Sequence, residues 1–233
     1  MDEVIGSEED LITAHLLVAA DLAEDLQRTR IATDNRIRAI KQYKAGSTQQ
    51  LEAMSVAIKK LEVQATREIE KAMKNHKLGD WVARTPGIGY NTVGKLLAVI
   101  GEPSDRKTVG QLWAYCGLDV RDGVAPRHKK GVQGNWNDRA RVILYTMAEV
   151  IVKNKKSYYR PVYDKARVKY GTAVHGVECL MCGPKGQPAV VDSRLGLSHQ
   201  HKRAMRLVMK AIVRDIWIES KLVDGQEAER VAA

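Results

Sequence analysis

Residues 48–76 read TQQLEAMSVAIKKLEVQATREIEKAMKNH and hold the most regular apolar pattern of the chain. The apolar side chains recur at alternating spacings of three and four residues, at Leu51, Met54, Ile58, Leu61, Ala65, Ile69 and Ala72. Such spacings place side chains on one stripe of a helix, as in the seam of a coiled coil. The sequence therefore predicts one long amphipathic helix over residues 48–76.

A second long helix is predicted just before this one, over residues 7–44. Its apolar residues fall on one face by their three-, four- and seven-residue multiples, and they are Leu11, Val18, Leu22, Leu26, Ile37 and Ile40. Gly46 stands where a C-terminal cap is expected. Because the connection is short, we expect the two helices to pack as an antiparallel hairpin. This hairpin predicts a homo-oligomer or a docking site for a partner.

Residues 79–101 carry the first motif that points to chemistry. A short apolar helix is followed by Pro86-Gly-Ile-Gly89, and another helix is predicted from Tyr90 to Ile100. This pattern resembles the helix-hairpin-helix motif of DNA-binding proteins. Glycines allow the backbone to approach a phosphate closely, and the amides that begin a helix lack intrahelical acceptors. The candidate phosphate contacts are Thr85, Pro86, Gly87, Ile88, Gly89, Asn91, Thr92 and Lys95. A tight turn that contacts no ligand is the alternative interpretation.

The positive charge of the chain is concentrated in one segment. The 233 residues carry a formal net charge of +10, and residues 121–170 hold 13 lysines and arginines against four acids, a net charge of +9. A located cluster of this kind indicates a nucleic-acid partner, with DNA as the first expectation and RNA as the alternative. The candidate DNA-binding cations are Arg127, Lys129, Lys130, Arg139 and Arg141.

A second motif lies near the C-terminus, where Cys179-Leu-Met-Cys182 is followed by His199-Gln-His201. Two thiolates on a tight turn and two imidazoles at a helix start can complete a tetrahedral zinc site. The predicted ligands of this structural zinc are Cys179, Cys182, His199 and His201, with His175 able to replace one of the histidines. A redox-active cysteine pair and two unliganded cysteines are the alternatives.

Several classes of protein are disfavoured by the sequence. No apolar run reaches the ~18 residues of a membrane span, and the N-terminus MDEVIGSEED is acidic where a secretory signal is basic. Three cysteines make no disulfide framework. We therefore expect no membrane partner and a cytoplasmic location, associated with the nucleoid if the source is bacterial or phage.

The stretch from about Thr85 to Tyr170 resembles the C-terminal domain of the insertion-sequence transposases related to the Piv DNA invertase. The likeness is carried by Thr85-Pro-Gly-Ile-Gly89, Ile100-Gly-Glu-Pro103, Gln111-Leu-Trp-Ala-Tyr-Cys-Gly-Leu118, Lys129-Lys-Gly131 and Tyr159-Arg-Pro-Val-Tyr163. The predicted hairpin is similar to the coiled coil that precedes this domain in the family. The resemblance implies DNA recombination, and in some members a guide RNA.

Two departures from the family bear on catalysis. Family transposases carry an N-terminal RuvC-like domain with four acidic metal ligands, and we expect no such domain in this sequence, which begins at the coiled coil. The family also places a catalytic serine in a Gly-x-x-Ser-Lys-x-Gly-Asn/Asp segment. Here Gly134 stands at the serine position, within Gly131-Val-Gln-Gly-Asn-Trp-Asn-Asp138. Glycine offers no nucleophile, so the sequence supplies no catalytic residue at this position.

The expected fold class is all-α, in three parts. Residues 1–78 form the helical hairpin, residues 79–170 the helix-hairpin-helix transposase-like domain, and residues 171–233 the zinc knuckle with a C-terminal helix. The predicted function is binding of duplex DNA mainly through its phosphate backbone. One alternative is an active transposase or recombinase completed by a nuclease domain on another chain, and another is an RNA-binding or scaffold protein.

Overall fold

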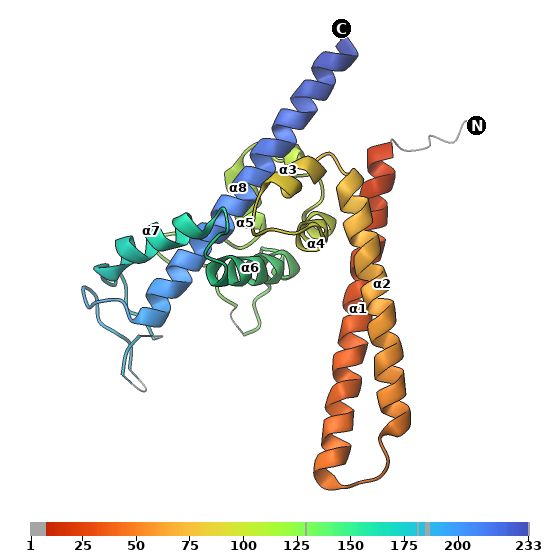
Figure 1. Cartoon of the computed structure of the whole chain (residues 1–233). Coiled ribbons are helices and arrows are strands. Elements are labelled where there is room, and N and C mark those ends of the chain that lie inside the picture. The colour runs from red at the N-terminus through yellow and green to blue at the C-terminus, as the bar shows by residue number, and fades with distance from the viewer. Residues whose placement is uncertain (1–7, 129, 181, 185–186, 233) are drawn as a thin grey trace. The chain divides into compact units, whose positions relative to one another are not determined.

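The described part of the chain is built from helices, which confirms the predicted all-α class. The computed structural model describes residues 8–128, 130–180, 182–184 and 187–232 (Figure 1). Within these residues, extended pairing is limited to isolated β-bridges. The chain divides into two compact units, of which the first holds the N-terminal hairpin with Gly89–Gly101, and the second holds Trp81–Ile88 and the residues after Gly101. The predicted three-part division stays a prediction.

The first unit is built on α1 (Glu8–Tyr43) and α2 (Gln49–Asn75), which lie side by side as a long hairpin (Figure 1). Their bounds agree with the predicted helices, but the buried face of α1 differs from the predicted one. Leu11, Val18 and Leu22 are exposed, whereas the buried residues of α1 include Leu16, Ala19, Ala20, Ala23 and Ile37. Small alanines make up much of this buried face, while Leu11, Val18 and Leu22 remain on the outer face.

Polar side chains fix the register of the hairpin. Arg30 Nε lies 2.6 Å from Glu62 Oε2, and both side chains are largely buried. Asp34 accepts a hydrogen bond of 2.5 Å from the Ser55 hydroxyl. Further along, Lys41 Nζ lies 2.7 Å from Glu52 Oε1. The partners run in opposite directions along the two helices, which confirms the antiparallel hairpin. Arg30 and its neighbour Lys59 hold the pKa of the Glu62 carboxyl below its usual value.

Helix α4 (Tyr90–Ile100) completes the first unit by packing on both α1 and α2. Val93, Leu96, Leu97 and Ile100 are buried in this contact layer. Gly94 permits the close approach, because a Cβ atom there would lie 2.6 Å from Ile69 Cγ2 and 3.2 Å from Leu16 Cδ2. The second half of the predicted DNA-binding motif is therefore built into the hairpin unit. The short helix α3 (Gly79–Arg84) lies just before it in the sequence.

The second unit is organised around α8 (Leu197–Ala232). The 3-10 turn η1 (Pro103–Asp105), α5 (Val109–Tyr115), α6 (Asp138–Lys153) and α7 (Arg160–Gly171) all pack against α8. Ala204, Val208, Ile212 and Ile216 recur every four residues on its buried face. Two tryptophans fasten neighbouring segments to this helix: Trp113 Nε1 donates to the Lys210 carbonyl at 3.0 Å, and Trp217 Nε1 to the Arg106 carbonyl at 2.9 Å. No helix among the described residues combines the length and apolarity needed to cross a bilayer.

Candidate nucleic-acid interface and metal centre

The turn at 85–88 is docked on a second segment of its own unit. The Pro86 carbonyl accepts a hydrogen bond of 2.8 Å from the Tyr158 amide and one of 3.3 Å from the Ser157 hydroxyl. Gly87 has φ +96°, and a Cβ atom there would lie 2.2 Å from Ser157 Oγ. The buried Thr85 hydroxyl donates to the Trp81 carbonyl at 2.6 Å. The glycine of this turn thus serves internal packing, and the Pro86 ring is exposed.

The other candidate contacts lie at the start of α4, in the first unit. Gly89 is exposed, and a Cβ atom added there would meet no heavy atom within 4 Å. The Thr92 hydroxyl donates to the Gly89 carbonyl at 3.0 Å, and Asn91 Oδ1 is buried without a partner among the described residues. Lys95 is half-buried, and desolvation lowers the pKa of its ammonium group while Glu62 and Glu24 oppose that shift. Its charge therefore faces acids of the hairpin.

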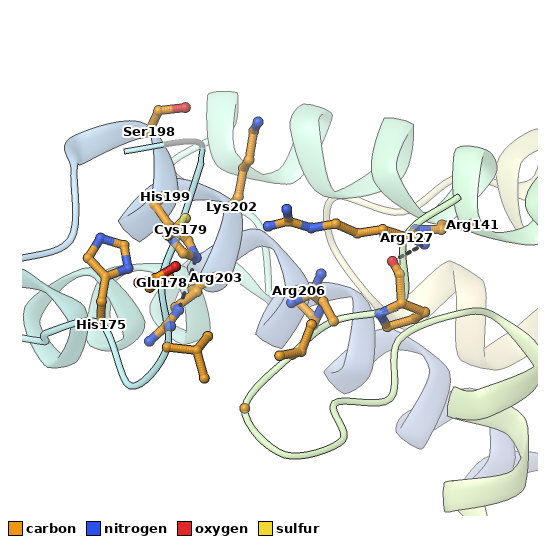
Figure 2. A pocket seen from close by; sticks show the side chains of 15 residues that line it. Arg127, Arg141, His175, Glu178, Cys179, Ser198, His199, Lys202, Arg203 and Arg206 are labelled. Atoms are coloured by element: carbon orange, nitrogen blue, oxygen red, sulfur yellow. Dashed lines mark hydrogen bonds between the residues drawn. The ribbon is translucent and has the colours of Figure 1, made fainter. Parts of the chain in front are cut away.

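The predicted cations of residues 127–141 have different surroundings. Lys130 and Arg139 are exposed, and Lys129 lies outside the described residues. Arg127 and Arg141 line a cavity of about 340 Å³ in the second unit (Figure 2). One guanidinium nitrogen of Arg141, Nη1, donates to the Pro126 carbonyl at 3.2 Å. Two of the five predicted cations thus meet at a defined site.

Sequence reasoning missed the cations that complete this cavity. Lys202, Arg203 and Arg206 project from the first turns of α8 and line the same space as Arg127 and Arg141 (Figure 2). A signal is present in the sequence, because Lys202, Arg206 and Lys210 follow one another at four-residue spacing and so share one helix face. That signal lies outside residues 121–170, the segment of highest net charge.

The region around Gly134 is packed by the Trp136 ring. A Cβ atom at Gly134 would lie 3.0 Å from ring carbons of Trp136, and one at Gly117 would lie 2.7 Å from the same ring. The Trp136 indole donates to Asp138 Oδ1 at 2.8 Å. The next residue, Asn137, caps α6 by accepting from the Ala140 amide. The glycine at the family's serine position therefore supports a tryptophan that fixes the loop before α6.

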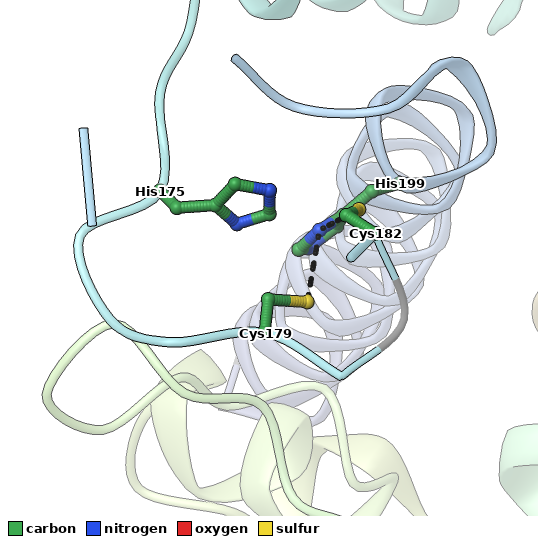
Figure 3. Close-up of side chains that lie close together, drawn as sticks. All are labelled: His175, Cys179, Cys182 and His199. Atoms are coloured by element: carbon green, nitrogen blue, oxygen red, sulfur yellow. Dashed lines mark hydrogen bonds between the residues drawn. The ribbon is translucent and has the colours of Figure 1, made fainter. Parts of the chain in front are cut away.

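Four potential metal ligands converge where the 173–195 loop meets the start of α8 (Figure 3). One donor atom from each of His175, Cys179, Cys182 and His199 lies within 4.8 Å of all the others. Cys179 Sγ is 3.7 Å and Cys182 Sγ 3.4 Å from His199 Nδ1. These four residues are close enough to hold a metal ion. Three of them belong to the predicted set, and His175, the alternative ligand, completes the group.

The local fold brings the cysteines to this point. Cys179 and Ala189 exchange backbone hydrogen bonds of 3.0 and 2.8 Å, which close the loop below the knuckle. A Cβ atom at Gly183 would lie 2.0 Å from the Gln187 carbonyl oxygen, so a side chain larger than hydrogen does not fit directly after Cys182. His175 is held in the same way, because its amide and carbonyl bond to Ser193 and Asp192.

His175 and His201, the two alternative histidine ligands, have different surroundings. His175 is buried, and its Nε2 atom has no hydrogen-bond partner among the described residues, as expected for a nitrogen that coordinates an ion. His201, a predicted ligand, lies outside the group and pairs its Nδ1 with the Tyr163 hydroxyl at 2.8 Å. Burial and nearby cations, Arg203 first among them, lower the pKa of His199 to about 4. Its imidazole is therefore neutral at pH 7, the form that binds metals.

The comparisons with known proteins find that one segment of the chain is similar to a known family. Residues 80–164 match the family described as Transposase IS116/IS110/IS902 family. This match confirms the resemblance to a transposase domain and covers α4, α5, α6 and the basic loop before α6. No curated protein matches the chain.

Proposed function

We propose that this chain is a transposase-related protein that binds duplex DNA through the phosphate backbone. The observation that carries the proposal is the overlap of two features: the transposase-family segment ends at residue 164, and the most basic stretch of the sequence begins at residue 121. The alternative of an RNA partner uses the same charges, and competition between duplex RNA and duplex DNA separates the two.

Electrostatics supply most of the binding energy in this proposal. Each phosphate neutralised by a lysine or arginine releases condensed counterions, so log K falls with log salt at a slope of about −0.9 per contact. Lys130, Arg139 and Arg127 are exposed, so a polyanion can approach them from solvent. Contacts of this kind position the protein on DNA without reading its sequence.

The start of α4 supplies a second phosphate contact in the proposal. The amides of its first turn have no intrahelical acceptor, and Gly89 leaves the approach open. Lys95 adds little, because its charge is directed toward Glu62 and Glu24. We therefore assign a smaller share of the binding to this helix start than to the basic stretch.

The proposed metal is a structural zinc ion held by His175, Cys179, Cys182 and His199. A tetrahedral zinc with ordinary bond lengths separates a thiolate sulfur from an imidazole nitrogen by about 3.5 Å. The distances of 3.7 and 3.4 Å from His199 Nδ1 to the two sulfurs lie on either side of that value. With four protein ligands the ion has no open position, so it would hold the 173–195 loop against α8.

We also propose that the hairpin associates with a second copy of the chain. Leu11, Val18 and Leu22 are exposed on α1 at spacings of seven and four, and Met54 and Leu61 are exposed on α2 at a spacing of seven. Apolar stripes of this kind are typical of helix–helix interfaces. Val18→Glu with Leu22→Glu is expected to convert a dimer into a monomer in light scattering. A wild-type protein that is monomeric at tens of micromolar would refute this part.

The enzyme alternative is not supported at Gly134 or at Ser157. Gly134 has no nucleophile and lies against Trp136, and the Ser157 hydroxyl is buried in its bond to Pro86. In this alternative, as in the sequence prediction, a nuclease domain on another chain completes the recombinase. A plasmid-cleavage assay with Mg²⁺ on the purified protein tests this alternative directly.

The salt dependence of DNA binding tests the main proposal. We expect the affinity for a duplex of about 30 base pairs to fall steeply between 50 and 200 mM salt, and the variant Lys130→Gln/Arg139→Gln to reduce the salt slope by one to two. Fluorescence anisotropy measures both quantities. The control is Lys60→Gln, an exposed lysine of the hairpin. A flat salt dependence, or equal slopes for the variant and the control, would contradict the proposal.

A further inference from the structure

The arginine-lined cavity of the second unit is strongly unbalanced in charge. Five cations line it, and they are Arg127, Arg141, Lys202, Arg203 and Arg206. Among the described residues of the lining, the single carboxylate is that of Glu178, an exposed residue. In Figure 2, Arg206 lies between Arg203 on one side and Arg127 and Arg141 on the other. Like charges gathered around one space repel each other unless an anion occupies it.

Arg206 is the centre of this imbalance. Its Nε atom is buried and donates no hydrogen bond to any described residue. Burial lowers the pKa of its guanidinium, and Arg141, Arg203 and Arg127 lower it further, while the opposing influence comes from Tyr170. A partly buried charge without a nearby carboxylate is costly, because its partial removal from water is not compensated. The arrangement is suited to an anionic ligand that supplies the missing partner.

The neighbouring guanidinium groups retain further donors for such a ligand. Arg141 donates one hydrogen bond to Pro126, and Arg203 Nε lies 3.3 Å from His199 Nε2. Each guanidinium carries five N–H donors, so these contacts involve only one donor of each group. A guanidinium presents paired N–H groups that match two oxygens of a phosphate, which makes arginine the preferred residue for this anion.

The space continues beyond the cations, which favours a polymer over a small ion. A second cavity of about 490 Å³ shares Arg127, Arg141, Lys202 and Arg206 with the first. It extends to Tyr145, an exposed aromatic residue, and to Met209. A base or sugar next to a bound phosphate could therefore lie against an aromatic face, which is how single strands are commonly held.

We propose that this cavity binds a phosphate group of a nucleic-acid strand, with Arg206 as its central ligand and Arg127 and Arg141 beside it. The proposal rests on the proposed nucleic-acid binding and adds a specific phosphate site to it. Arg206 and Lys202 belong to α8, outside the basic stretch and outside the family segment. The same phosphate chemistry could come from free phosphate, so the experiment includes both sources.

The decisive variant is Arg206→Gln in the zinc-loaded protein, with Lys107→Gln as the control. Lys107 is an exposed lysine of the same unit that does not line the cavity, so both variants remove one positive charge. We expect Arg206→Gln to lose about tenfold or more in affinity for a 20-nucleotide strand, and the control to lose less than twofold. Arg127→Gln, on an exposed loop, should reproduce the loss if Arg206→Gln folds poorly.

Melting temperatures distinguish binding at this cavity from a general attraction of the strand to positive charge. Without ligand, Arg206→Gln should melt at the same temperature as the wild type or higher, because it removes a repelled charge. Adding the strand should raise the melting temperature of the wild type by more than that of the variant. Equal affinities of Arg206→Gln and Lys107→Gln would overturn the cavity proposal and leave DNA binding standing.

Inorganic phosphate is the probe for the case in which the proposed nucleic-acid binding itself fails. If the wild type binds neither duplex nor strand, the proposed function fails and this proposal fails with it. Stabilisation by millimolar phosphate in the wild type, lost in Arg206→Gln, would then identify a site for free phosphate only. Binding of the strand that phosphate competes away, and that Arg206→Gln weakens, is the result that supports a strand phosphate at this site.

Discussion

At the scale of single residues, Gly87 fits a sequence motif for phosphate binding but also has a packing role inside the protein. The sequence predicts a glycine that lets a phosphate approach the backbone. In the structure, Gly87 adopts φ +96° and lies against Ser157, so both its conformation and its missing Cβ are used inside the protein. A glycine in a turn carries no information about which of these needs it meets, because either one excludes a side chain.

Replacing Gly87 by alanine should destabilise the second unit. The new Cβ would lie 2.2 Å from Ser157 Oγ on a backbone with positive φ, and the two effects together are expected to cost about 2–4 kcal/mol. Chemical denaturation followed by circular dichroism measures the loss. Gly89→Ala is the matched control, because nothing lies within 4 Å of its Cβ position. Equal stability of the two variants would show that the turn is not packed as described.

The histidines provide a second prediction at this scale. We expect His175→Ala to lose most of the bound zinc and His201→Ala to retain it, because His201 pairs with Tyr163 while His175 faces the cysteines. Metal analysis of the purified variants gives the answer directly. Retained zinc in His175→Ala together with lost zinc in His201→Ala would restore the ligand set predicted from the sequence.

At the scale of helices, the sequence predicts lengths better than faces. The two hairpin helices have the predicted bounds within one residue, and the end of α1 lies just before Gly46, the predicted cap. The buried face of α1 was not predictable from large apolar residues alone. Besides Leu16 and Ile37, this face holds Ala19, Ala20 and Ala23, whose small side chains are a weak hydrophobic signal in the sequence but pack closely in the structure. The cation row of α8 was missed for a similar reason, because three charges at four-residue spacing resemble an ordinary solvated face.

The close packing of α4 against the hairpin depends on Gly94. We predict that Gly94→Ala destabilises the first unit by about 1–3 kcal/mol, because the new methyl would approach Ile69 Cγ2 to 2.6 Å and the β-branched Ile69 has little freedom to move. The double variant Gly94→Ala/Ile69→Ala should recover part of the loss by opening the contact. Simple additivity of the two changes would mean that the side chains do not meet.

At the scale of the whole molecule, the excess positive charge and the candidate metal ligands both belong to the second unit. Residues 121–170 carry a net charge of +9, the cations of α8 extend that surface, and the four candidate metal ligands lie beside it. The first unit offers apolar stripes and internally paired charges such as Arg30 with Glu62. The composition predicts that a polyanion is bound, but only the fold joins segments distant in sequence into one cavity.

Because the candidate metal ligands belong to one unit only, the two units are expected to respond differently to removal of the metal. We expect the proposed zinc ion to stabilise the unit that contains its ligands, because binding free energy is coupled to the folding of the site. Chelation should therefore accelerate hydrogen exchange in the loop and at the start of α8. The buried helical amides of α1 and α2 should keep their protection. Mass spectrometry of peptides before and after chelation tests this expectation, with Cys182→Ser as a metal-free control. A loss of protection that is uniform over both units would mean that they fold as one cooperative body.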